Sequence, residues 1–362
     1  MSHRTLRRSK NAIVPRWEHE LADYQDQNYM DSITLGDLQK VTYLDTAHLE
    51  GRIVKLMPFW DGADWHLWIS TPDGLMEGKV VDTTEGDYIS KMAAKQSDLF
   101  IPFVHLMWQR ASWRDVCPLI LAISDDFHNM GTSVAKLKHF FDFRHTIPSG
   151  GANRFALTEL EYLVTLARTV FDLLQEMISA IWRDRVRLDD ASAEAFRRRH
   201  PLPEKFSKIV FNNKEALKTV EEIETQYGLP RPLAEQYAVT GPFFSRLRRI
   251  RDNVIHGGSG FGHIFDTERG FCVNPKISPF SSFGDWRTEH YYNENIVSVL
   301  PWIASTILQT IDACSRLAST FISIIRVPPE IAPGYFVFVR GPHNEALVDL
   351  LKINSGAPPW WA

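Results

Sequence analysis

Hydrophobic residues in the centre of the chain recur with the period of an α-helix. From Leu119 to Phe141, apolar residues follow one another at steps of three and four positions, so they share one helical face. The same spacing continues from Leu160 to Ile181 and again from Ile296 to Ile325. Each of these stretches predicts a long helix that buries one side.

Two more helices are predicted between the second and third of these stretches. One spans about residues 204–227 and ends at Gly228. The other spans residues 232–254, with an interruption at 240–242, where a glycine precedes a proline, and it stops at Gly257-Gly258. Together these patterns favour an antiparallel bundle of four or five helices.

Shorter β-type segments lie on both sides of the helical region and within it. Residues 51–60 and 64–71 are aromatic and β-branched runs separated by turn residues, which predict a small sheet. A helix near residues 88–96 is expected beside that sheet. Residues 263–273 predict a β-hairpin, and residues 335–339 predict one strand.

The chain is therefore predicted to be mainly α, with a smaller mixed α/β domain at its N-terminus. The expected division is a mixed α/β module at residues 1–112, which we interpret as a sensor or a docking site for a partner. A helical domain follows at 116–326, with a loop and hairpin insertion at 257–290. Residues 327–362 form a tail that holds the last strand.

Composition excludes several classes of protein. Hydrophobic residues make up 44% of the 362 and charged residues 23%, which excludes a mainly disordered chain. The formal net charge is −4, so any contact with nucleic acid needs a local basic patch. The three cysteines are far apart and have no CxxC spacing, which argues against a disulfide framework or a cysteine-based zinc site.

Neither a secretory signal nor a membrane span is predicted. The basic N-terminal residues are not followed by an apolar core of signal length. The most apolar stretch, 296–325, contains Gln309, Asp312 and Arg316, so it is predicted to be a core helix. A cytoplasmic protein is expected.

The common catalytic motifs are missing from the sequence. It has no GxSxG elbow, no phosphate-binding loop that ends in Gly-Lys-Ser/Thr, and no HExxH. The glycine-rich residues 257–262 follow a helix, whereas a dinucleotide fingerprint follows a strand. No metal ligands and no cofactor are therefore predicted.

One segment at a predicted helix end carries a charged and polar cluster. It reads Arg251-Asp252-Asn253-Val254-Ile255-His256. Asp252 and His256 are four residues apart and hence on one face, so the carboxylate can orient the imidazole. Arg251 lies about 140° around an ideal helix from His256. The two can meet on one phosphate only if the last turn distorts or a second chain supplies its own pair.

This segment resembles the motif of the HEPN (higher eukaryotes and prokaryotes nucleotide-binding) family. The family motif is Arg, four residues and His, with a polar residue directly after the Arg, at the end of a helix in a four- or five-helix bundle. Arg251 to His256 matches the spacing, the polar second position and the apolar pair before His. The resemblance covers about residues 116–326.

The resemblance implies a metal-independent endoribonuclease that acts as a homodimer. Many relatives are toxins or antiviral defence effectors, so an RNA substrate and an antitoxin or regulatory partner are expected. His256 is the expected general acid or base, and Arg251 the residue that stabilises the phosphate. Asp252 and Asn253 are expected to orient His256 or to contact the substrate. Arg248 and Arg249 precede the motif, and two interpretations of them stay open: they bind the RNA backbone, or they are solvated surface residues.

Two alternatives stay open at this point. An arginine, an aspartate and a histidine near the end of a helix are also ordinary structural features. If these residues have only a structural role, the chain is a non-catalytic helical binding or scaffold protein of a multi-subunit complex.

The role of several tryptophans is also open. They provide either core packing, which is favoured, or a surface that stacks on bases. They are Trp60, Trp65, Trp68, Trp108 and Trp113.

Overall fold

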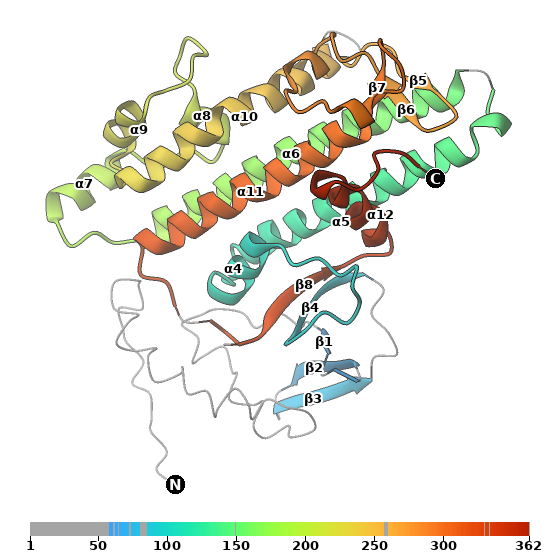
Figure 1. Cartoon of the computed structure of the whole chain (residues 1–362). Coiled ribbons are helices and arrows are strands. Elements are labelled where there is room, and N and C mark those ends of the chain that lie inside the picture. The colour runs from blue at the N-terminus through green and yellow to red at the C-terminus, as the bar shows by residue number, and fades with distance from the viewer. Residues whose placement is uncertain are drawn as a thin grey trace. The chain divides into compact units, whose positions relative to one another are not determined.

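The computed structural model describes residues 58–60, 62–63, 65–71, 74–79, 85–148, 150–256, 260–328, 330–332 and 334–361. The protein is mainly helical, as predicted (Figure 1). The helices are α4 (Pro102–Arg110), α5 (Cys117–Asp142), α6 (Gly151–Asp184), α7 (Ala191–Arg199), α8 (Phe206–Val210), α9 (Val220–Tyr227), α10 (Arg231–His256), α11 (Leu300–Ile324) and α12 (Asn344–Lys352). The strands are β1 (Pro58–Trp60), β2 (Trp65–Thr71), β3 (Gly74–Lys79), β4 (Gly86–Ser90), β5 (Phe265–Asp266), β6 (Phe271–Val273), β7 (Val297–Ser298) and β8 (Phe336–Arg340). Within these ranges, no helix is both long enough and apolar enough to cross a membrane.

The chain forms two compact units, each built from three separate stretches. Unit 1 comprises Met1–Ser124, Leu173–Val239 and Ser315–Arg340. Unit 2 comprises Asp125–Asp172, Thr240–Cys314 and Gly341–Ala362. Each of the four long helices, α5, α6, α10 and α11, contributes one part to each unit. The predicted ranges 1–112, 116–326 and 327–362 stay a prediction, because residues 1–57 lie outside the described part.

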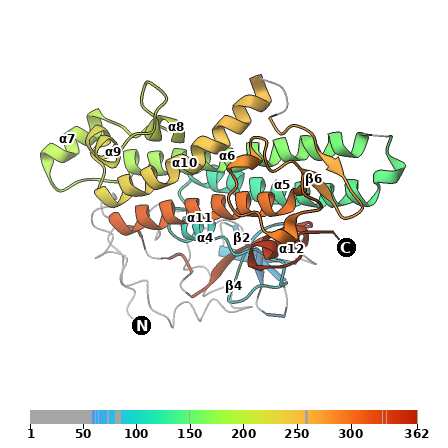
Figure 2. The same ribbon diagram turned by 45° about the horizontal axis from the view of Figure 1, so that its top comes forward.

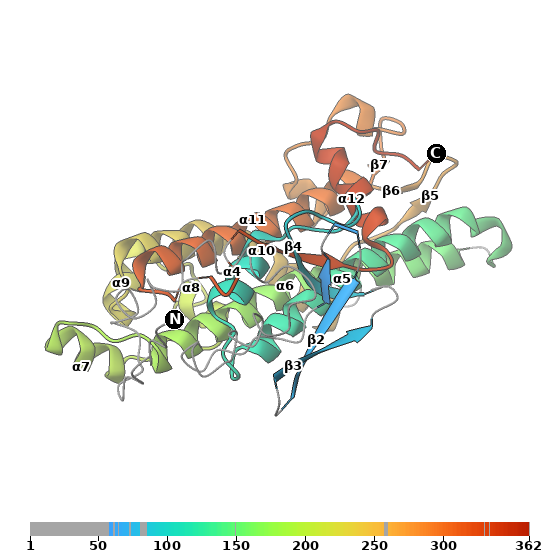
Figure 3. The same ribbon diagram turned by 90° about the horizontal axis from the view of Figure 1, so that it is seen from below.

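Unit 1 contains a five-stranded sheet in the order β3-β2-β1-β4-β8. The pairs β1–β2, β2–β3 and β4–β8 are antiparallel, and β1 pairs with β4 in parallel. Figure 3 shows β2 and β3 side by side, with β4 nearby. The predicted sheet is confirmed where β1 and β2 are described, and the strand predicted for the tail is β8, which pairs with β4.

The helix predicted near residues 88–96 is wrong. Residues 86–90 form β4, in which Tyr88 pairs with Phe338 and the two rings stack at 5.4 Å. Asp87, on the opposite face of the strand, is also buried and accepts hydrogen bonds from Trp108 and Ser124. The β8 partner lies about 250 positions further along the chain, so no local pattern indicates this strand.

The three stretches with clear helical spacing form α5, α6 and α11, as predicted, but the third helix starts at Leu300 because Val297–Ser298 form β7, which pairs with β6. In unit 2, the end of α5 runs antiparallel to the start of α6 (Figure 2), since Phe140 contacts Phe155 while Ser133 donates a hydrogen bond to Glu159. The predicted apolar faces are buried, with Ile123, Phe127 and Val170 at 1% exposure or less. Burial of these faces, more than helix propensity, is what stabilises helices of this length.

The single helix predicted for residues 204–227 is wrong in its middle. The chain forms α8, then a turn closed by a bridge between Phe211 and Leu217, then α9. Glu215 has φ of 62°, which a continuing right-handed helix excludes. Thr219 and Glu222 form a capping box that starts α9. The predicted stop at Gly228 is confirmed, with φ of 62°.

The interruption predicted at residues 240–242 is also wrong, because α10 continues through Pro242. Proline removes one hydrogen bond from a helix interior, a cost that packing on either side can offset. Tyr237 and Phe244, before and after the proline, are both 0% exposed. The predicted glycine stop at 257–258 lies outside the described residues.

Unit 2 also contains a small sheet in the order β5-β6-β7, in which the predicted hairpin is the antiparallel pair β5–β6. Phe261, Phe280 and Trp302 form an aromatic cluster with ring centroids 5.2–5.9 Å apart. This cluster fixes the loop after α10 against the start of α11. The packing interpretation of the tryptophans is confirmed for Trp108 and Trp113, which are 1% and 4% exposed.

Candidate functional site

The candidate site lies on the last turns of α10, in unit 2. α10 is described as far as His256, so the motif lies on the last described turns of this helix. Leu247 and Ile250 are 1% and 9% exposed and hold one face of these turns in the core. Three arginines lie on the same turns: Arg248 and Arg251 are half-buried, and Arg249 is exposed. Asn253 is exposed as well.

Asp252 is the centre of the polar cluster. One of its carboxylate oxygens accepts a hydrogen bond from Arg251 Nη1 at 3.2 Å, and the other lies 3.3 Å from Arg248 Nε. The three side chains are 27–37% exposed, so solvent screens the attraction only in part. One carboxylate therefore holds two guanidinium groups close together and leaves a net positive charge.

Arg251 retains capacity for hydrogen bonding beyond this ion pair. Its Nε atom is buried, and none of the described residues accepts a hydrogen bond from it. A buried donor without an acceptor costs free energy, which a ligand with an oxygen at this position would recover. A guanidinium with a fixed neighbour and a free donor suits a phosphate oxygen.

Three of the predicted residues are thus brought together, namely Arg248, Arg251 and Asp252. The predicted contact of Asp252 with His256 stays a prediction, because the side chain of His256 lies outside what the structure describes. The convergence of Arg251 and His256 stays a prediction for the same reason. Where the chain is described again, Gly260 lies against the helix, and a Cβ there would meet Asn253 and the Ile250 carbonyl at 3.4 Å.

Sequence reasoning missed a polar contact between α10 and α11. Arg246 Nη2 donates to Gln309 Oε1 at 3.4 Å, and Gln309 Nε2 donates to Ser305 Oγ at 2.8 Å. The available signal was Gln309 in a mainly apolar stretch that also holds Asp312 and Arg316, since a polar side chain in such a helix indicates a polar contact.

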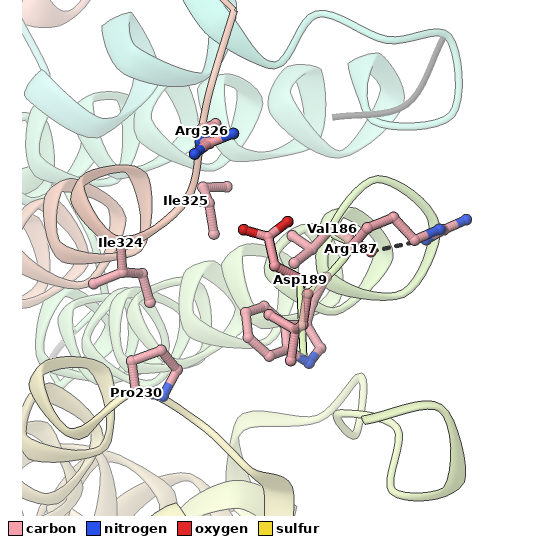
Figure 4. Close-up of a pocket in the computed structure, with 9 residues that line it drawn as sticks. Val186, Arg187, Asp189, Pro230, Ile324, Ile325 and Arg326 are labelled. Carbon is pink, nitrogen blue, oxygen red and sulfur yellow. Dashed lines mark hydrogen bonds between the residues drawn. The ribbon is translucent and has the colours of Figure 1, made fainter. Parts of the chain in front are cut away.

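A cavity of about 170 Å³ lies in unit 1, and none of the motif residues lines it. Figure 4 shows Ile324 and Ile325, at the end of α11, together with Pro230 and Asp189 around it. This volume is below the roughly 300 Å³ at which small-molecule sites begin. Across the described residues, no group of three or more histidine, cysteine or acidic side chains is arranged to hold a metal ion.

Asp126, on α5 in unit 2, is a second unusual titratable group. Its Oδ2 atom is buried and has no hydrogen-bond partner within the described ranges. Burial, and then the charge of Asp125, raises the pKa of Asp126 to about 7. Ionisation of this carboxyl at neutral pH therefore opposes folding.

Asp126→Asn should raise the melting temperature by several degrees at pH 8, and by progressively less as the pH falls to 4. The unfolded carboxyl titrates near 3.8 and the folded one near 7, so stability falls with rising pH between these values and then stays constant. Asparagine does not ionise and removes that loss. Thermal unfolding of Asp126→Asn and the wild type at several pH values measures this difference in melting temperature. A benefit from Asp126→Asn that is independent of pH would contradict the raised pKa.

The comparisons with known proteins add no relative. No protein-family model matches the chain, and neither a curated protein nor a solved structure does so.

Proposed function

We propose that the protein is a metal-independent endoribonuclease of HEPN type. The observation that carries the proposal is the Arg251–His256 motif at the C-terminal end of a long helix, with Arg251 beside Arg248 and Asp252. The mainly helical fold and the cationic character of the cluster support it. A toxin or defence role, with an antitoxin or regulatory partner, is part of the proposal.

The proposed reaction is attack of the ribose 2′-hydroxyl on the adjacent phosphate. A base removes the hydroxyl proton, an acid protonates the leaving 5′-oxygen, and a cation stabilises the developing phosphorane. His256 supplies an imidazole that titrates near neutrality, and Arg251 supplies the cation. The products are a 2′,3′-cyclic phosphate and a 5′-hydroxyl.

The proposed active form is a homodimer. The reaction needs a base and an acid at opposite ends of the scissile bond, whereas the motif contributes one histidine per chain. Two copies of the motif that face one cleft supply both groups. Two copies of Arg251 then also surround the phosphate.

The test is incubation of the purified protein with mixed end-labelled RNA in EDTA. We expect cleavage by the wild type, products that end in 2′,3′-cyclic phosphate, and loss of cleavage in His256→Ala. His263→Ala is the matched control, because His263 is exposed in the loop that follows the motif. Equal cleavage by His256→Ala and wild type would overturn the assignment. Intact RNA with the wild type at every protein concentration and pH would favour the scaffold alternative.

A further inference from the structure

A cavity of about 510 Å³ in unit 2 has the composition of a site for a planar polar ligand. Its volume falls within the roughly 300–1,000 Å³ of small-molecule sites. The loop before β7 supplies Phe283, Asp285, Trp286 and His290, α11 supplies Ser305, and the turn after α12 supplies Asn354. Aromatic rings, donors and an acceptor therefore line the same cavity.

The indole of Trp286 is held in place but is not stacked. Its Nε1–H donates to the Phe280 carbonyl at 3.3 Å, which ties it to the aromatic cluster of the loop. The rings of Phe283 and His290 lie nearly perpendicular to it, at 78° and 82°. Among the described rings, none stacks in parallel on Trp286. A fixed indole of this kind is a stacking platform for a planar ring.

Two hydrogen-bond donors of the cavity residues have no acceptor among the residues that the structure describes. Asn354 Nδ2 is buried and unpartnered in the described part of the chain. His290 is 5% exposed, and its Nδ1 atom accepts from the Arg287 backbone N–H at 3.2 Å. Burial lowers the pKa of His290, so the ring is neutral and carries its proton on Nε2. Both donors favour a ligand with a carbonyl oxygen.

Asp285 adds an acceptor, since its exposed carboxylate also lines the cavity. A carbonyl oxygen beside a ring N–H satisfies donors and acceptor together. Guanine and uracil present this pair of groups, whereas adenine and cytosine present an amino group beside an unprotonated ring nitrogen. Arg287 is 51% exposed with only a 3.9 Å contact to Glu289, so it is available to a phosphate.

Two hydrogen bonds join the cavity to α10, the helix that carries the candidate site. Ser305 lines the cavity and accepts from Gln309, which in turn accepts from Arg246 on α10. Arg246 precedes Arg251 by five residues, a rise of about 7.5 Å along the helix. Five residues also turn an ideal helix by about 140°, so this chain of hydrogen bonds reaches α10 on a different face from Arg251.

We propose that this cavity binds an unpaired guanine or uracil base of the RNA strand, stacked on Trp286 and bound along its carbonyl and N–H edge. The inference rests on the proposed function, because it takes RNA as the substrate. The proposed base site gives the enzyme a preference for guanine or uracil, and the residues that determine this preference are separate from the catalytic residues.

The experiment measures binding in the His256→Ala background, so that cleavage does not interfere. Fluorescence anisotropy compares labelled oligoribonucleotides in two matched pairs, oligouridine with oligocytidine and oligoinosine with oligoadenosine. Each pair differs only in whether the base carries the carbonyl and N–H edge. We expect tighter binding of oligouridine and oligoinosine, by about fivefold or more.

Variants of the cavity then locate the effect. Trp286→Ala should weaken binding of oligouridine by about fivefold or more, whereas Trp286→Phe, which keeps an aromatic face, should retain most of it. Asn354→Asp replaces the unpartnered donor by an acceptor and should abolish the preference within both pairs. Equal affinity for the members of both pairs, or a preference that survives Asn354→Asp, would overturn the proposal.

Two results would distinguish a missing base site from a missing nuclease activity. RNA cleavage that depends on His256 but has no base preference would leave the nuclease and remove the base site. Binding that prefers uridine and inosine, and depends on Trp286, with no cleavage by the wild type would leave the base site and remove the nuclease.

Discussion

Replacing Arg197 with methionine is expected to lower the free energy of unfolding of the protein by about 3–5 kcal/mol. The guanidinium of Arg197 is 3% exposed and forms a two-pronged ion pair with Glu194, with distances of 2.8 and 2.9 Å. It also donates to the carbonyl of Trp182. Methionine fills the volume but leaves Glu194 and a carbonyl at the end of α6 without their donor.

The same contacts give this ion pair a defined pH dependence. The hydrogen bond from Arg197 is the largest of the contacts that lower the pKa of Glu194 from 4.5 to about 2, against the opposing effect of burial and with smaller contributions from Arg198 and the Leu188 backbone N–H. The stabilisation is therefore complete above pH 4.5 and is lost as the pH falls toward 2. Urea unfolding followed by circular dichroism, at pH 7 and pH 3, measures both the size of the effect and its pH dependence.

Arg198→Met is the matched control, because Arg198 also contacts Glu194, at 2.7 Å, but is 63% exposed. An exposed ion pair contributes about 1 kcal/mol at most. If Arg197→Met and Arg198→Met destabilised the protein equally, burial would not be the reason for the effect.

The fold was predictable from the sequence where burial follows a local period. Each of α5, α6 and α11 buries one face, and that face is visible as apolar residues three and four positions apart. The prediction failed where the structure depends on a contact between residues far apart in the sequence, or on the backbone conformation of a single residue. Tyr88 is in a strand because of Phe338, and the chain turns between α8 and α9 at Glu215, whose φ of 62° no periodicity indicates.

We expect Arg251→Ala to reduce the rate of RNA cleavage by about 10²–10³, the usual loss when one group that stabilises transition-state charge is removed. Arg251→Lys should fall between alanine and wild type, since lysine restores the charge but not the planar fork. Single-turnover cleavage of end-labelled RNA measures all three proteins.

Arg316→Ala provides the comparison, because Arg316 is an exposed arginine on α11 outside the cluster. It should leave the rate unchanged. A uniform loss in Arg251→Ala and Arg316→Ala would point to general charge attraction instead of a role at the scissile phosphate, and both losses would then shrink at higher salt.

The candidate site could be predicted only in part. The spacing of Arg251 and His256 pointed to the end of a helix, and both residues lie on the last described turns of α10. The sharing of Asp252 by Arg248 and Arg251 depends on side-chain conformations that spacing does not specify. The cavity beside Trp286 joins residues from positions 283, 305 and 354, which only the tertiary packing brings together.

The three-stretch construction of each unit limits how this protein can be divided. No single cut in the chain separates the stretches of unit 1 from those of unit 2, since their order alternates along the sequence. A gene fragment that encodes unit 2 alone would need two artificial joins and would interrupt α5, α6, α10 and α11. Recombination between genes therefore exchanges these units less readily than it exchanges domains that follow one another in the sequence.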